Sequence, residues 1–195
     1  MTTVSVNFIQ KKQCILDHEE IIASQLARKV VDKPHISLWM ILIPIIFIFH
    51  FQFYRRWKAG VKLFVEAYMK DLRTLFKSVE EDQISGGDTY PSFSSSISGA
   101  LEKPVRAYQK FMKEHFKKLL DANGTSYAEM VRAAYPSAAD YRAYIAQRTT
   151  LTKNIEDTLG LKELAQVAVQ EKIHSVLPTI QDRFVQHIYG SSPAS

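Results

Sequence analysis

The residue pair with the most recognisable chemical spacing is Glu171 and His174, which stand three positions apart in a segment expected to be helical. This spacing places a carboxylate and an imidazole on one helix face, and di-iron bundles use two such pairs with two further glutamates. A second Glu-x-x-His pair is absent from the sequence. We therefore expect no metal and no other cofactor, and we interpret Glu171 and His174 as a surface pair.

Other residues with reactive side chains form no recognisable catalytic set. His18, Glu19 and Glu20 have no helical metal spacing to another ligand, and the neighbours Glu114 and His115 point their side chains about 100° apart on a helix. The single cysteine, Cys14, excludes a disulfide within the chain; we interpret it as a simple thiol, with lipidation as the alternative. No phosphate-binding glycine loop or nucleophile elbow is present. The sequence therefore offers no positive case for an enzyme.

Two polar residues, His50 and Gln52, lie in an otherwise apolar run. Polar groups inside a bilayer are costly and often functional. His50 is little more than one helical turn from a basic cluster, so its side chain can reach the membrane interface. We favour interfacial placement, and a quinone or proton site near His50 and Gln52 is the alternative.

The element that must hold these two residues is the run ISLWMILIPIIFIFHFQF at 36–53. As a helix it would be about 27 Å long, close to the roughly 30 Å hydrocarbon core. Trp39 lies near one end, Trp57 follows the other, and Pro44 lies in the middle. We predict a membrane anchor over 34–58, with spanning favoured over a re-entrant hairpin. The basic residues after it are predicted to lie at the interface: Arg55, Arg56 and Lys58.

The charges that flank this run indicate its orientation. Fifteen residues before it hold three Lys/Arg, and fifteen after it hold four. This bias places the C-terminal part in the cytoplasm. The segment LWMILIPIIFIFHFQFYRR also resembles a segment near the N-terminus of a group of small bacterial membrane proteins without an assigned activity. The resemblance covers about 34–58 and implies a bacterial, membrane-bound protein, hence the inner (cytoplasmic) membrane.

Helical patterns occupy both sides of the anchor. Residues 1–33 contain an amphipathic helix over 14–32, which either lies on the membrane or folds back on the soluble part. A juxtamembrane helix over 59–82 carries apolar residues at alternating spacings of four and three, typical of a packed seam. We predict one helix of a bundle that continues out of the membrane, with a seam that offers a surface to a partner or to a second copy: Val61, Val65, Tyr68, Leu72, Leu75 and Val79.

A serine- and glycine-rich stretch at 83–99 is predicted to be a flexible linker that precedes a soluble helical domain over 100–190. The first helix of that domain, over 101–121, is amphipathic, with a basic stripe opposite its apolar face. Anionic lipid headgroups are the candidate ligand of this stripe, and a merely solvated face is the alternative. Its members are Lys103, Arg106, Lys110, Lys113 and Lys117.

Local signals divide the rest of the domain. Ser126-x-x-Glu129 reads as a capping box, Tyr135-Pro136 ends that helix, and Ser137 with Asp140 starts the next. Two last helices are predicted, divided near Pro178. Residues 191–195 are predicted to be a disordered tail.

Composition supports an all-α fold, a single membrane helix continuing into a soluble helical bundle. Glycine and proline number only seven each, and no useful strand signal appears. The net charge of +5 arises around the anchor and the basic stripe, without a nucleic-acid recognition motif, so we expect no nucleic-acid binding. We expect a membrane-anchored interaction or scaffold protein, not an enzyme, with a protein partner or self-association. An accessory subunit of a membrane complex, such as a respiratory one, and an enzyme acting on lipid-linked substrates from a re-entrant anchor are the alternatives.

Overall fold

The described residues of the chain, 6–31, 44–87, 89–90, 99–159 and 164–190 of a computed structural model, form six α-helices and no strand. The all-α prediction is therefore confirmed. The helices are α1 (Val6–Val30), α3 (Pro44–Ser85), α4 (Gly99–Asp121), α5 (Tyr127–Ala134), α6 (Ala138–Leu159) and α7 (Leu164–Tyr189).

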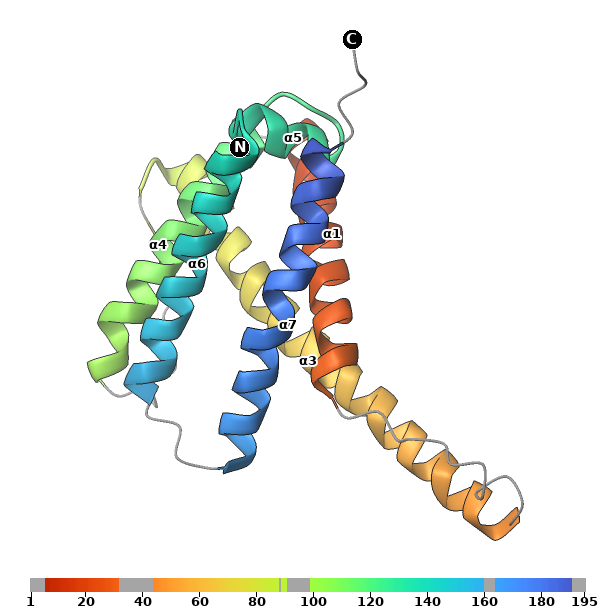
Figure 1. The fold of residues 1–195 in the computed structure, drawn as a ribbon. Coiled ribbons are helices and arrows are strands. Elements are labelled where there is room, and N and C mark those ends of the chain that lie inside the picture. The colour runs from red at the N-terminus through yellow and green to blue at the C-terminus, as the bar shows by residue number, and fades with distance from the viewer. Residues whose placement is uncertain (1–5, 32–43, 88, 91–98, 160–163, 191–195) are drawn as a thin grey trace.

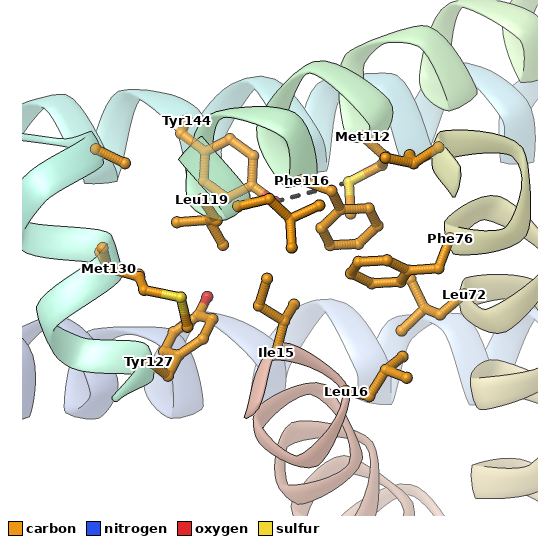
Figure 2. Packing of buried hydrophobic residues seen from close by; sticks show 14 of the residues in the cluster. Ile15, Leu16, Leu72, Phe76, Met112, Phe116, Leu119, Tyr127, Met130 and Tyr144 are labelled. Atoms are coloured by element: carbon orange, nitrogen blue, oxygen red, sulfur yellow. Dashed lines mark hydrogen bonds between the residues drawn. The ribbon is translucent and has the colours of Figure 1, made fainter. Parts of the chain in front are cut away.

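The helices pack in pairs around one principal core. α1 lies along α3 and α7, α4 lies along α6, and the short α5 closes one end of the bundle (Figure 1). The first part of α3 extends well beyond the other helices (Figure 1). The core draws large apolar side chains from helices at both ends of the sequence, including Ile15 of α1, Phe76 of α3 and Phe116 of α4 (Figure 2). The rings of Phe76 and Phe116 stack with centroids 4.2 Å apart.

The N-terminal helix folds back on the bundle. Ile15 and Ala23 of α1 are fully buried, and Lys11 donates hydrogen bonds to the carbonyls of Leu120 (2.9 Å) and Ala122 (2.7 Å) at the end of α4. Of the two placements that the sequence left open for this helix, the structure shows packing against the bundle. The predicted boundary at 83–99 does not divide the core, which takes residues from both sides of it.

Helix boundaries follow local chemistry where the signals are local. The capping box of α5 is present, because Ser126 accepts from the backbone N–H of Glu129 and the Glu129 carboxylate accepts from that of Ser126. Ser137 and Asp140 bond reciprocally at the start of α6. Gly124, between α4 and α5, adopts φ +141°, and a Cβ there would lie 2.7 Å from the Cβ of Glu129. Only glycine fits this turn without strain.

Two predicted boundaries were wrong. α7 is continuous through Pro178, although a break was predicted there. Pro178 lies on the exposed face, where water can solvate the carbonyl that loses its partner, while Ile180 keeps the opposite face packed against α1. α3 also continues to Ser85, beyond the predicted start of the linker. Residues 88 and 91–98 of the linker, and the predicted tail 191–195, lie outside the described residues.

Candidate functional site

The junction where α3 leaves the bundle is the first candidate site. Trp57 Nε1 of α3 donates a hydrogen bond to the carbonyl of Val31, 3.2 Å away, directly after the end of α1. Gly60 lies beside the same residue: a Cβ at Gly60 would be 3.3 Å from Val31 Cγ1. The end of α1 is thus held against α3, because a small residue and an indole donor stand one turn apart on the facing helix.

The basic residues predicted to lie at a membrane interface are at this junction. Arg55, Arg56 and Lys58 are exposed on α3, and Trp57 between them is partly buried. The first part of α3 continues past them, away from the other helices (Figure 1). Their side chains therefore lie where α3 extends beyond the other described helices.

The predicted anchor falls partly outside what the structure describes. Trp39 and the rest of 36–43 lie outside the described residues, and Pro44 is the first residue of α3. His50 and Gln52 lie in α3, but their side chains are also outside the described part. None of the helices in the described ranges combines the length and the apolar character needed to cross a membrane.

A buried ion pair is the strongest electrostatic feature of the bundle. Glu19 of α1 is 1% exposed and receives two hydrogen bonds from Arg148 of α6, Nη1 to Oε1 at 3.2 Å and Nη2 to Oε2 at 3.3 Å. Tyr68 of α3 donates its hydroxyl to the same carboxylate and accepts from Arg148 Nη2 at 2.6 Å. The cluster therefore joins three helices through groups that are 129 and 80 residues apart in sequence.

The charge state of Glu19 is fixed by this arrangement. Burial by itself raises the pKa of a carboxyl group, but the charge of Arg148 and the hydrogen bonds from Arg148 and Tyr68 outweigh it and lower the pKa of Glu19 to about 2. The same carboxylate raises the pKa of Arg148 well above its usual range, against the effect of burial. A carboxylate held ionised and paired in this way is poorly suited to proton transfer near neutral pH.

Two histidines lie beside the same core, His115 buried and His18 partly buried. Burial lowers the pKa of His18 to about 4 and that of His115 to about 3. His18 stacks on Tyr127 with ring centroids 3.6 Å apart, and His115 Nδ1 lies 2.7 Å from the hydroxyl of Tyr135. Both imidazoles are therefore neutral at physiological pH. No local sequence pattern reveals that these two imidazoles lie against the core.

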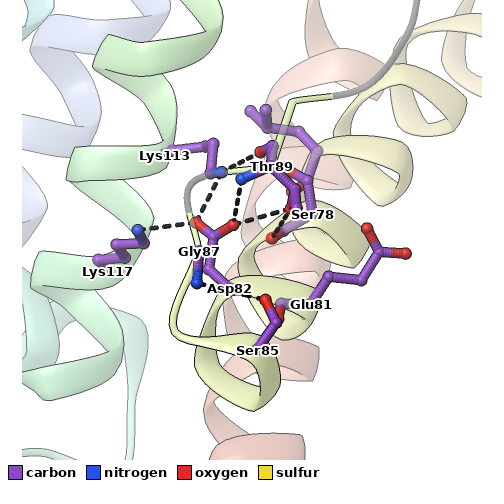
Figure 3. Close-up of polar contacts among 9 residues, drawn as sticks. Ser78, Glu81, Asp82, Ser85, Gly87, Thr89, Lys113 and Lys117 are labelled. Atoms are coloured by element: carbon purple, nitrogen blue, oxygen red, sulfur yellow. Dashed lines mark hydrogen bonds and ion pairs between the residues drawn. The ribbon is translucent and has the colours of Figure 1, made fainter.

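A second polar cluster fastens the end of α3 to α4 (Figure 3). The carboxylate of Asp82, 4% exposed, lies 2.7 Å from Lys113 Nζ and 2.8 Å from Lys117 Nζ. Thr89 donates its backbone N–H and hydroxyl to Asp82 at 2.7 and 2.8 Å, and its carbonyl accepts from Lys113. Burial would raise the pKa of Asp82, but these hydrogen bonds hold it well below its usual range. Thr89, placed in a flexible linker from the sequence, is thus docked.

The basic stripe of α4 is only partly available to solvent. Including Lys113 was wrong, because its side chain is 2% exposed and its charge is neutralised by Asp82. Lys117 is paired with the same carboxylate, and Arg106 lies 3.6 Å from Glu102. The other two members, at positions 103 and 110, are exposed. The amphipathic pattern could not separate a solvated lysine from one whose partner comes from another helix.

The predicted helical seam belongs to the interior of this chain. Leu72, Leu75 and Val79 are buried, and Val65 and Tyr68 pack against the same core. Val61 is partly buried. α1 of the same chain covers the seam, as expected for one helix of a bundle, so its buried residues are not open to a partner. The heptad spacing identifies an apolar face and does not say which helix will cover it.

The remaining candidates form no further site. His174 pairs with Glu156 of α6 at 2.8 Å, not with Glu171, because the two helices run side by side. No group of three or more potential metal ligands occurs within the described residues. Cys14 is a half-buried thiol against the core, and burial raises its pKa.

The chain matches no protein-family model, no curated protein and no solved structure. The resemblance of residues 34–58 to bacterial membrane proteins therefore rests on that short run alone.

Proposed function

We propose that this chain is a non-enzymatic, membrane-anchored helical interaction protein, held at the bacterial inner membrane with its bundle in the cytoplasm. The observation that carries the proposal is the continuity of the apolar run with α3. Residues 44–53, PIIFIFHFQF, are the first part of a helix that extends beyond the bundle. None of the other described helices lies along this apolar end (Figure 1), and a bilayer would supply the apolar environment that it requires.

The junction chemistry supports the same proposal. Arg55, Arg56 and Lys58 follow the apolar run at once, where cationic side chains can contact anionic headgroups. Each such contact contributes about 1 kcal/mol near an anionic surface. The exposed Lys103 and Lys110 of α4 are the members of the basic stripe that could add to this attraction.

The interior of the bundle favours an interaction role over catalysis. Arg148 of α6 neutralises the buried charge of Glu19, and two lysines of α4 neutralise that of Asp82. A partner would then contact exposed apolar side chains. Leu63 of α3 is 66% exposed and lies close to the junction. The partner is either another membrane-associated protein or a second copy of this chain.

Membrane fractionation of the full chain tests the anchor. Wild type should remain in the membrane pellet after carbonate washing, whereas the double variant Ile46→Arg/Ile48→Arg should become soluble. Two arginines in the hydrocarbon region cost about 6 kcal/mol, which lowers membrane partitioning roughly 10⁴-fold. Leu63→Arg, the same type of change at an exposed position on the same helix, should stay membrane-bound. A soluble wild-type chain would overturn the anchor.

Gentle detergent extraction tests the interaction role. Wild type should be recovered with a partner or as an oligomer, and Leu63→Arg should lose that association while it remains in the membrane. Recovery of the wild type as a lone monomer would overturn the interaction role and leave the anchor standing.

A further inference from the structure

The two ends of the apolar segment meet at one point of the fold. Val31, which precedes the segment, accepts a hydrogen bond from Trp57, which follows it, at 3.2 Å. α1 and α3 run antiparallel from that point, because Lys12 near the start of α1 pairs with Glu80 near the end of α3 at 2.6 Å. The two residues that border 32–56 in the sequence therefore lie in contact at one point of the fold.

A helix that crosses a bilayer separates its ends by the thickness of the hydrocarbon core, roughly 30 Å. Val31 and Trp57 could reach opposite faces only if α1 came away from α3. That change would expose Ile15, Ala23 and Ala27 of α1, which are fully buried, and would break the ion pair of Glu19. A spanning anchor would therefore require α1 to lose its packing against the bundle along its whole length.

The lengths of the two parts of the segment, residues 32–43 and the start of α3, are compatible with insertion from one side. From Pro44 to Trp57, α3 rises about 20 Å, which is less than the full hydrocarbon thickness but more than one leaflet. Twelve residues connect Val31 to Pro44, and a chain of that length reaches at most about 40 Å, enough to cover the same distance. Pro44 is the first residue of α3, so the deepest helix end has one backbone N–H fewer to satisfy in an apolar medium.

We propose that the apolar segment enters the membrane from one side and returns to it, so that Val31 and Trp57 lie at the same interface. The inference rests on the proposed membrane anchoring and replaces a spanning helix by monotopic insertion. The ligand of this segment is the lipid of the cytoplasmic leaflet. The anionic headgroups of that lipid attract the cationic side chains of the exposed Arg55, Arg56 and Lys58. In this arrangement the whole bundle, α1 included, remains on one side.

Cysteine pairs in the full chain test the contact in the membrane. In a Cys14→Ser background, Val31→Cys/Gly60→Cys places two thiols where the Gly60 Cβ approaches Val31 Cγ1 to 3.3 Å, within disulfide range. Mild oxidation of washed membranes should produce an internal disulfide, seen as faster migration on a non-reducing gel. Val31→Cys/Glu81→Cys, with the second thiol near the far end of α3, is the matched control and should stay reduced.

Single cysteines test the topology without requiring a close contact. Lys29→Cys and Lys62→Cys lie at exposed positions before and after the segment. With a membrane-impermeant maleimide, both should be protected in intact cells and both labelled in inverted vesicles. Labelling from opposite sides, together with no disulfide, would overturn monotopic insertion while membrane anchoring stands. Recovery of the wild-type chain in the soluble fraction would overturn both.

Discussion

Replacing Glu19 with glutamine removes a buried negative charge and keeps the shape of the side chain. Arg148, whose side chain is 15% exposed, would then remain in the core without its counter-ion. Removing one partner of a buried ion pair costs about 3–5 kcal/mol, because the other charge stays desolvated. The pKa of Glu19 leads to a similar figure: its fall from 4.5 to about 2 corresponds to about 3 kcal/mol at neutral pH.

The sign of the pH dependence follows from the same shift. Because the folded-state pKa of Glu19 is depressed, its contribution to stability is fully present above about pH 4.5 and is lost as the pH falls toward 2. Glu19→Gln lacks this contribution at every pH. The difference in unfolding free energy between wild type and variant should therefore shrink as the pH is lowered through this window.

Thermal unfolding of the full chain in mild detergent, followed by circular dichroism at 222 nm, measures the effect. For a chain of this length, a loss of 3 kcal/mol lowers Tm by about 6–12 °C. Glu66→Gln is the matched control, because Glu66 makes an exposed 3.5 Å pair with Lys62, with side chains 57% and 77% exposed. Such a pair contributes at most about 1 kcal/mol. Equal Tm values for Glu19→Gln and Glu66→Gln would refute the reasoning.

A double-mutant cycle separates the pair from general damage to the core. Glu19→Leu and Arg148→Met should each destabilise the bundle, while the double variant should be more stable than the sum of the two losses predicts. Strictly additive losses would show that the two side chains do not act as a pair.

Three further changes are expected to alter the stability of the bundle by distinct mechanisms. Gly124→Ala should cost about 1–3 kcal/mol of unfolding free energy, because φ is +141° and the new Cβ would lie 2.7 Å from the Cβ of Glu129 in the next helix. The control Gly99→Ala places its Cβ in open space and should not destabilise the bundle. Equal Tm values for the two variants would contradict backbone strain at Gly124. Lys113→Met should cost about 2 kcal/mol of unfolding free energy, because it removes a buried charge partner of Asp82. Lys110→Met, at an exposed position, should have almost no effect. An unchanged stability of Lys113→Met would show that the ion pair with Asp82 is dispensable. His115, whose pKa burial lowers from 6.5 to about 3, should cost the wild type about 2 kcal/mol as the pH falls from 6.5 to 5, since the unfolded state binds the proton more tightly. His115→Phe should lose less stability over that range in urea titrations, and parallel pH profiles would exclude this histidine as the cause.

Several features of the fold could be predicted because their causes lie within a few residues. Ser126 with Glu129 and Ser137 with Asp140 bond across three positions, so their helix starts are readable in any sequence. The scarcity of Gly and Pro and the amphipathic periodicity were enough for the all-α class. Pro178 shows the limit of such signals, because a proline on an exposed face need not end a helix that is packed on its other side.

The candidate site was harder to predict because its members are distant in sequence. Glu19 and Arg148 are 129 residues apart, and nothing near either residue marks it as buried. Lys113 has the spacing of a solvated stripe, yet its partner Asp82 comes from the preceding helix. A helix pattern specifies which side chains share a face, but burial depends on what packs against that face.

The apolar run also has some features that the sequence determines and others that depend on tertiary packing. The sequence by itself determined that residues 36–53 form an apolar stretch, and that basic residues follow it, because these are properties of the side chains in order. Only the tertiary structure decided that Val31 and Trp57 lie 3.2 Å apart, and that α1 covers the seam of α3. The physical reason is that hydrophobic burial is non-directional: composition and periodicity create an apolar surface, and the packing of the whole chain selects its partner.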